Sequence, residues 1–182
     1  LHVGGELGFQ RSSAWAEAPA FKPGRVDSAE IERGIEPFGF AVMHLPASNY
    51  LTAMTLGGVF DQFPTLRCGR IELGCSWFGS FAEGLDMWAG KVFHKRLAPF
   101  IHMKPSEYLN RNVRISPFNY FEDILLQFER YPQLSDSYCY SSDYPHYEGG
   151  YESPAVIRER IKGLGDEICD KFFYKNGEWL LP

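Results

Sequence analysis

The chain has 182 residues, of which 45% are hydrophobic and 16% aromatic, a composition typical of a folded globular domain with a sizeable core. Its net charge is −5 and its pI is near 5.5, so the charge of the whole chain gives no indication of electrostatic binding to nucleic acid or anionic lipid. No apolar stretch is long enough to span a membrane, and the first residues lack the charged segment of a signal peptide. We therefore expect a cytoplasmic protein without a membrane or nucleic-acid partner.

The first five residues are typical of a strand end at residues 1–3, followed by the turn Gly4-Gly5. A natural domain rarely begins at the end of a strand. We therefore expect either that preceding residues were removed or that this chain is part of a longer one. Residues 6–36 mix Ser, Ala, Pro and Gly without periodicity, which predicts a long excursion with a short helix near residues 28–34. Such excursions often build substrate pockets.

The rest of the chain alternates predicted helices with predicted strands. Apolar spacing predicts a helical region over residues 38–60 with Pro46 in the first turn, and then a strand over residues 66–73 with Glu72 near its end. Further helices are predicted at residues 77–88, 107–111 (capped by Ser106), 122–131, 153–163 and 166–174, and further strands at residues 113–117 and 137–142.

This order of elements is a series of βα units whose strands are well separated in the chain. Such strands pair in parallel through crossover helices. The fold class is therefore α/β, and the pattern corresponds to about four of the eight units of a closed (β/α)8 TIM barrel.

Polar residues follow the predicted strands at the positions where such barrels carry their reactive groups. These residues are His2, Glu72, Ser116 or Asn119, and Asp143. A His, a Glu and an Asp that converge on one mouth suit a divalent cation, and a carboxylate beside a metal-bound water can take its proton. Asp143 ends the apolar stretch Tyr138-Cys139-Tyr140, which favours a functional role for it.

Each candidate also has a simpler interpretation. His2 could be merely exposed, Glu72 could cap the next helix, and Asp143 could begin a turn. His146 could lie behind the site or contact substrate. His44, His94 and His102 lie among aromatic residues on predicted helices and indicate packing or surface positions.

The four cysteines and the aromatic residues favour packing roles. Cys68, Cys75, Cys139 and Cys169 form no C-x-x-C pair, which disfavours a structural zinc site and predicts free thiols, buried at Cys68 and Cys139. The aromatic residues near the predicted mouth could line a pocket, but packing under loops is the better prediction for most of them. They are Phe118, Tyr120, Phe121, Tyr144 and Tyr147.

Three stretches, taken in order, resemble one known family. They are L-H-V-G-G at residues 1–5, G-G-V-F-D-Q-F-P-T-L-R at residues 57–67 followed by I-E-L-G-C-S-W, and S-S-D-Y-P-H-Y-E-G-G at residues 141–150. Together they resemble the second amidohydrolase family, metal-dependent (β/α) barrels related to aminocarboxymuconate semialdehyde decarboxylase. The resemblance runs from the first residue to about Asn176, and the middle and last motifs are the more specific.

The resemblance implies a role for two residues and also shows two departures. His2 matches the fifth-strand His of the family, and Asp143 matches the eighth-strand Asp. Glu72 stands where decarboxylase members carry a sixth-strand His, which weakens a direct transfer of decarboxylase activity. The H-x-H pair of the family's first strand occurs nowhere in this sequence. The whole chain, residues 1–182, therefore resembles the C-terminal half of such a barrel. The resemblance implies that it supplies roughly strands 5 to 8 with their helices, with the long excursion at 6–36 and closing helices at 153–182.

Two function hypotheses follow. The first is a hydrolase or non-oxidative decarboxylase that uses a divalent metal, zinc or else manganese, on a small carboxylated or cyclic substrate. Its metal ligands would be His2, Glu72 and Asp143, with Asp143 and His146 in catalysis. The second is a non-catalytic half-barrel that acts as a structural or interaction module. We expect the missing half to come from an N-terminal piece or from another copy in a homo-oligomer, because a half barrel exposes two sheet edges and much apolar surface.

Overall fold

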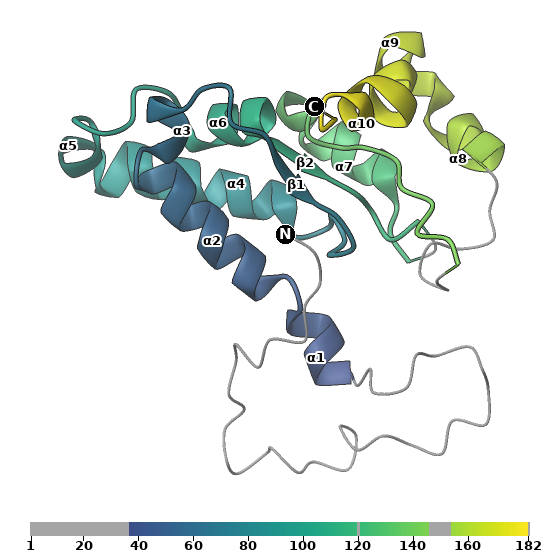
Figure 1. The fold of residues 1–182 in the computed structure, drawn as a ribbon, viewed down its shortest axis with the longest axis horizontal. Helices are drawn as coiled ribbons and strands as arrows, with labels where there is room; N and C mark the ends of the chain where they lie inside the picture. Colours follow the sequence, from purple (N-terminus) through teal and green to yellow (C-terminus); the bar gives the residue numbers. More distant parts are fainter. Residues whose placement is uncertain (1–36, 120, 146–153, 182) are drawn as a thin grey trace.

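The computed structural model describes residues 37–119, 121–145 and 154–181 of the chain. Its sheet consists of β1 (Cys68–Arg70) and β2 (Val113–Ile115), which pair in parallel with Cys68 opposite Val113 (Figure 1). Tyr138 extends the sheet through a parallel bridge to Ile115. Three chain segments therefore run side by side in sequence order, and the C-terminal end of each lies at the same edge.

Helices fill the sequence between these strands. Before β1 lie α1 (Pro37–Val42), α2 (Leu45–Leu56) and α3 (Val59–Gln62). Between β1 and β2 lie α4 (Phe78–Met87), a π-helix (Trp88–Val92), α5 (His94–Leu97) and α6 (Pro105–Asn112). After β2 come α7 (Ile124–Arg130), α8 (Pro154–Ile161), α9 (Asp166–Asp170), a second π-helix (Lys171–Lys175) and α10 (Asn176–Glu178). The helix–strand alternation and the parallel pairing confirm the α/β class.

The strands are shorter than the sequence predicts. The predicted strand at residues 66–73 is reduced to the three residues of β1, and the one at residues 137–142 to the single bridge at Tyr138. A strand extends only as far as its backbone pairs with a neighbouring segment, and the described segments pair over only a few residues. The strand expected at residues 1–3 lies outside the described residues. The complete set of four strands therefore stays a prediction.

One face of the sheet packs on α4, α6 and α7. The Tyr138 ring meets the edges of Phe78 from α4 and Phe128 from α7, with centroids 6.3 and 5.3 Å apart. Val113 and Ile115, on the same face, are fully buried in this apolar core. Burial of each such side chain stabilises the fold by about 1.5–3 kcal/mol. This packing fixes the direction of the strands and hence the position of their C-terminal ends.

The other face of the sheet meets the end of the chain. Because neighbouring strand residues point to opposite faces, Arg114 points away from the core formed around Ile115. Its guanidinium lies 3.9 Å from the centre of the Trp179 ring. Burial lowers the pKa of Arg114 to about 10. A Cβ placed on Gly69 would touch the Leu180 side chain, so the segment after α10 lies directly on β1.

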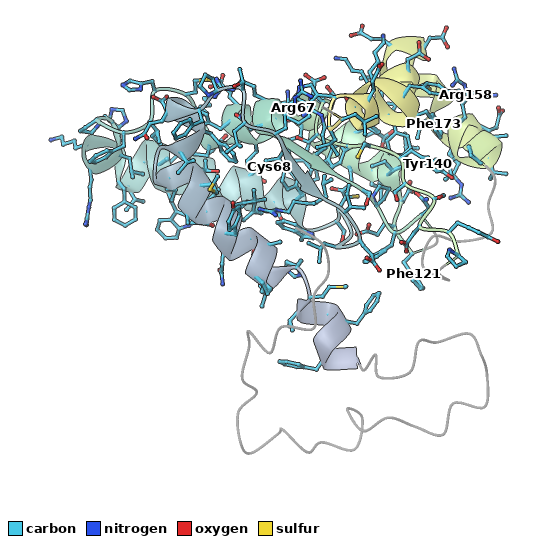
Figure 2. All side chains as sticks on the ribbon, in the orientation of Figure 1. Arg67, Cys68, Phe121, Tyr140, Arg158 and Phe173 are labelled. Carbon is cyan, nitrogen blue, oxygen red and sulfur yellow. The ribbon has the colours of Figure 1, made fainter. Side chains whose placement is uncertain are left out.

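The last helices also bond to the edge of the third chain segment. The Tyr140 N–H donates to the Phe172 carbonyl at 2.8 Å, and the Asn176 amide donates to the Tyr138 carbonyl at 2.8 Å. Figure 2 shows Tyr140 beside Phe173, whose rings lie 5.4 Å apart. The edge that faces away from β2 is thus occupied by the segment from the second π-helix to α10.

Two predictions about helix starts have different outcomes. Pro46 lies in the first turn of α2, as predicted. The prediction that Ser106 caps a helix is wrong, because α6 begins at Pro105, and Lys104 takes the capping position. Proline fits the first turn, where no backbone N–H is needed, so the cap must precede it. Ser106 instead donates from its hydroxyl to the Asp86 carboxylate at 2.7 Å.

Within the described residues, no helix has the length and apolar character needed to cross a bilayer.

Candidate active-site mouth

The three parallel strand segments end at the same edge of the sheet. We call this edge, with the residues that directly follow β1, β2 and Tyr138, the mouth. Glu72 lies two residues after β1, Ser116 directly after β2, and Asp143 five residues after the Tyr138 bridge. Glu72 is 7% exposed, and Asp143 is half-buried. Parallel strands bring these ends to one edge, as they do in barrel enzymes. The structure therefore places both predicted carboxylates at the same edge of the sheet.

Glu72 and Asp143 share an unusual backbone conformation. Their φ angles are 63° and 49°, in the left-handed region that side chains other than glycine rarely adopt. Within the described residues, they are the two non-glycine residues with positive φ. Such a conformation costs about 1–3 kcal/mol and is found mostly at functional sites and tight turns. Its occurrence at both carboxylates supports a functional role for this edge.

Two buried polar side chains connect the strand ends across the mouth. The Ser116 hydroxyl accepts a hydrogen bond from the Glu72 N–H at 3.3 Å. The Asn119 amide donates to the Ser141 carbonyl at 2.6 Å. Ser116 and Asn119 are 2% and 7% exposed. These residues, considered from the sequence as possible reactive groups, position the segments that carry Glu72 and Asp143.

A third carboxylate, Glu122, organises the same region and was missed as a site residue. Its side chain accepts hydrogen bonds from the backbone N–H groups of Cys75, Ser76 and Phe118, each at a shortest distance of 2.8 Å. Gly74 approaches so closely that a Cβ there would lie 2.8 Å from a Glu122 oxygen. Glu122 thus joins the segment after β1 to the segment after β2. From the sequence it was counted as the first residue of a helix, but α7 begins at Ile124, and the Asp123 carboxylate caps it.

His2 and His146 lie outside the described residues, as do Tyr120 and Tyr147. Within residues 37–119, 121–145 and 154–181, no three His, Cys, Asp or Glu side chains are grouped so as to hold a metal ion. Glu72 and Asp143 supply hard oxygen donors, but two carboxylates alone do not complete the ligand set of a zinc or manganese centre. A metal at this mouth would need donors from outside the described residues.

The described cysteines are all free thiols, as the sequence predicts. Cys75, Cys139 and Cys169 are buried, whereas Cys68, predicted to be buried, is only half-buried at the start of the short strand β1. Burial raises the pKa of Cys139 to about 11 and that of Cys75 well above its usual value. At neutral pH these two groups stay protonated, so the mouth offers no thiolate nucleophile from them.

The three described histidines occupy packing and surface positions, as predicted, although His44 lies in the turn before α2 and His102 between α5 and α6 rather than on helices. The His44 ring stacks on Trp77 with centroids 5.3 Å apart, and burial lowers its pKa. His102 is exposed and contacts the Asp61 carboxylate through Nδ1 at 2.9 Å. His94 is exposed on α5.

The aromatic residues at the mouth differ in their surroundings. Phe118 is buried and stacks on Phe40 with centroids 5.6 Å apart, which fits the predicted packing role. Phe121 and Tyr144 are exposed, Tyr144 to 89%.

No protein-family model matches the chain, and no curated protein matches it either. Among solved structures, the chain is similar to an amidohydrolase from Mycobacterium avium subsp. paratuberculosis. The TM-score is 0.58 at 24% sequence identity, over 78% of this chain and 36% of the other. The chain thus spans about a third of the length of the protein it matches. The likeness supports an amidohydrolase-like fold for the described α/β arrangement.

Proposed function

We propose that this chain forms the C-terminal half of a (β/α)8 barrel enzyme of the amidohydrolase superfamily. In this proposal it is a metal-dependent hydrolase or a non-oxidative decarboxylase that acts on a small carboxylated or cyclic substrate. The observation that carries the proposal is the pair Glu72 and Asp143. Glu72 follows β1 and Asp143 follows the Tyr138 segment, the two segments that pair with β2 on either side, and both residues have left-handed backbones, in a fold similar to that of an amidohydrolase.

The residues have distinct roles in this proposal. Asp143 binds the metal or takes a proton, and Glu72 binds the metal beside it. His2 completes the ligand set from the first residues of the chain, and His146 contacts the substrate. Zinc, or alternatively manganese, would supply Lewis acidity and lower the pKa of a bound water to about 7. Glu122 holds the two segments after β1 and β2 in register around these groups. The free thiols agree with the cytoplasm as the compartment.

One observation favours the alternative, a non-catalytic half-barrel module. In a closed barrel, every strand pairs on both sides, so the last strand meets the first. Here the corresponding edge, at Tyr138 and Tyr140, already bonds to Asn176 and Phe172. A domain with an occupied edge needs no second half to satisfy these backbone groups.

Metal analysis of the purified full-length protein distinguishes the two functions. The enzyme proposal predicts near-stoichiometric zinc or manganese, and loss of most of that metal in Asp143→Asn. This substitution removes the charge, while Asn tolerates the left-handed backbone better than most residues. Asp170→Asn is the matched control, because Asp170 lies on α9 in a surface ion pair with Arg158. Equal metal content in both variants, or no metal in the wild type, would contradict the proposed site.

A further inference from the structure

One segment of the chain has a charge opposite to that of the whole. Residues 87–104 contain no Asp or Glu but include Lys91, Lys95, Arg96 and Lys104. The complete chain carries a net charge of −5. Lys91, Lys95 and Arg96 are all exposed, so their charges act on the solvent side. The local field of this segment therefore attracts anions even though the whole protein is acidic.

The same segment also exposes large apolar side chains. Met87, Trp88, Val92, Phe93 and Phe100 are each between 42% and 59% exposed. The Trp88 and Phe93 rings lie 6.2 Å apart, so these two aromatic residues form a pair on the surface. Scattered apolar residues on a surface are ordinary, but a concentration of this kind marks an interaction site. We define the basic aromatic surface as the exposed side chains of residues 87–100.

The backbone of this surface is irregular, and the surface is remote from the mouth. At Trp88, α4 gives way to the π-helix, in which the Phe93 N–H bonds to the Trp88 carbonyl at 2.8 Å. Short π-helices occur often at functional sites. Figure 1 shows α5 at the end of the molecule opposite α8 and α9, while Figure 2 places Phe121, next to the mouth, on the other side from α5.

A cleft of about 930 Å³ opens beside this surface, between the end of α4, α5 and the start of α6. Lys91, His94 and Lys104 are among its lining residues. The Asp86 carboxylate in the same wall already accepts hydrogen bonds from the N–H and hydroxyl of Ser106, at 2.8 and 2.7 Å. A second acidic residue of the lining, Glu83, is exposed on α4, so the cleft itself is balanced in charge. The excess of positive charge lies beside the cleft, on the exposed side chains of residues 87–100.

We propose that the basic aromatic surface docks on an anionic lipid bilayer. Trp and Phe side chains favour the interfacial region of a bilayer, and nearby Lys and Arg side chains bind its phosphate groups. A symmetric contact with a second copy would place Lys91, Lys95 and Arg96 against their own copies, which like-charge repulsion opposes. Nucleic acid would account for the cations but not for the exposed Met87, Val92 and Phe100. The lipid surface explains both features together, and the protein would bind it peripherally.

Vesicle flotation of the full-length protein tests this proposal. We expect binding to vesicles of phosphatidylcholine with phosphatidylserine, weaker binding to phosphatidylcholine alone, and loss of binding at high salt. Each cation near such a surface contributes about fivefold to partitioning. The variant Lys91→Glu/Lys95→Glu should therefore bind about 25-fold more weakly or worse. Trp88→Ser/Phe93→Ser should lose binding to the same vesicles, with unchanged far-UV circular dichroism.

Matched controls come from the other end of the molecule. Lys162→Glu/Lys175→Glu makes the same charge change on exposed residues outside the surface, and Tyr174→Ser removes an exposed aromatic ring. Both should bind vesicles as the wild type does. The proposal is overturned if the wild type ignores phosphatidylserine vesicles, or if the controls lose binding as much as the surface variants. It is also overturned if Trp88→Ser/Phe93→Ser only converts an oligomer to a monomer, because the surface would then join copies of the chain.

Discussion

Glu122 illustrates how a single carboxylate can hold separate chain segments together through hydrogen bonds from their backbones. It accepts hydrogen bonds from three backbone N–H groups on two separate segments. Each such bond to a charged acceptor contributes about 1.5–3 kcal/mol. Gly74 makes room for this carboxylate. Its φ is 64°, and a Cβ at this position would lie only 2.8 Å from a Glu122 oxygen.

The first prediction concerns this carboxylate. Glu122→Gln keeps the size of the side chain but turns an amide NH2 group toward backbone N–H groups, so donors face donors. We expect a loss of about 2–3 kcal/mol in the free energy of unfolding, measured by urea denaturation. Glu167→Gln is the control, because Glu167 is exposed on α9, and its loss should cost less than about 0.5 kcal/mol. Equal effects of the two substitutions would show that Glu122 does not hold the mouth together.

The sequence located Glu72 and Asp143 but could not show how they are held. Their places after strand ends follow from apolar runs and from the rule for barrel sites. Their positive φ angles depend on tertiary hydrogen bonds, such as that from the Glu72 N–H to Ser116, which no local pattern encodes. Glu122 was missed for the same reason, since its partners lie 4 to 47 residues away in the chain.

At the scale of elements, helices were predicted better than strands. The helices at residues 77–88 and 166–174 and the proline in the first turn of α2 depend on local spacing, and the structure has them close to the predicted bounds. Strand length depends instead on neighbouring chains. The apolar residues 137–142 alone therefore predict more regular pairing than the single bridge at Tyr138 provides.

The contact between α10 and the sheet edge gives the second prediction. The Asn176 amide is 4% exposed and donates to the carbonyls of Ser135 and Tyr138, at 3.0 and 2.8 Å. Asn176→Ala leaves both buried carbonyls without this donor, so we expect a loss of about 1–3 kcal/mol in the free energy of unfolding. Amide hydrogen exchange at Tyr140, whose N–H bonds to Phe172, should accelerate in the same variant.

Gln133→Ala provides the control for this variant, because Gln133 is an exposed residue two positions before Ser135. It should leave both the unfolding free energy and the exchange rate of the Tyr140 amide near those of the wild type. If Asn176→Ala also has no effect on either quantity, α10 is not what protects this edge.

At the scale of the whole molecule, the two ends of the described structure have different characters. The mouth combines carboxylates with tertiary hydrogen bonds, whereas the far end combines exposed cations with exposed aromatic rings. The net charge of the complete sequence does not show this difference, because the negative charge of the other residues exceeds the positive charge of residues 87–104. The prediction of no lipid contact was drawn from that balance. Only the burial of each residue identifies which charges and apolar side chains reach the surface.

The last prediction concerns the missing half of the proposed barrel. A complete mouth needs donors beyond Glu72 and Asp143, and the H-x-H pair of the resembled family is absent from this sequence. We therefore expect native mass spectrometry of the purified full-length protein to show a mass above the 20.8 kDa of these residues, contributed by preceding residues of the same chain, by a second copy or by another chain that carries H-x-H. Denatured mass spectrometry of the same sample identifies which. A 20.8 kDa monomer with stoichiometric metal would contradict the need for a second half, and a metal-free 20.8 kDa monomer would favour the non-catalytic module.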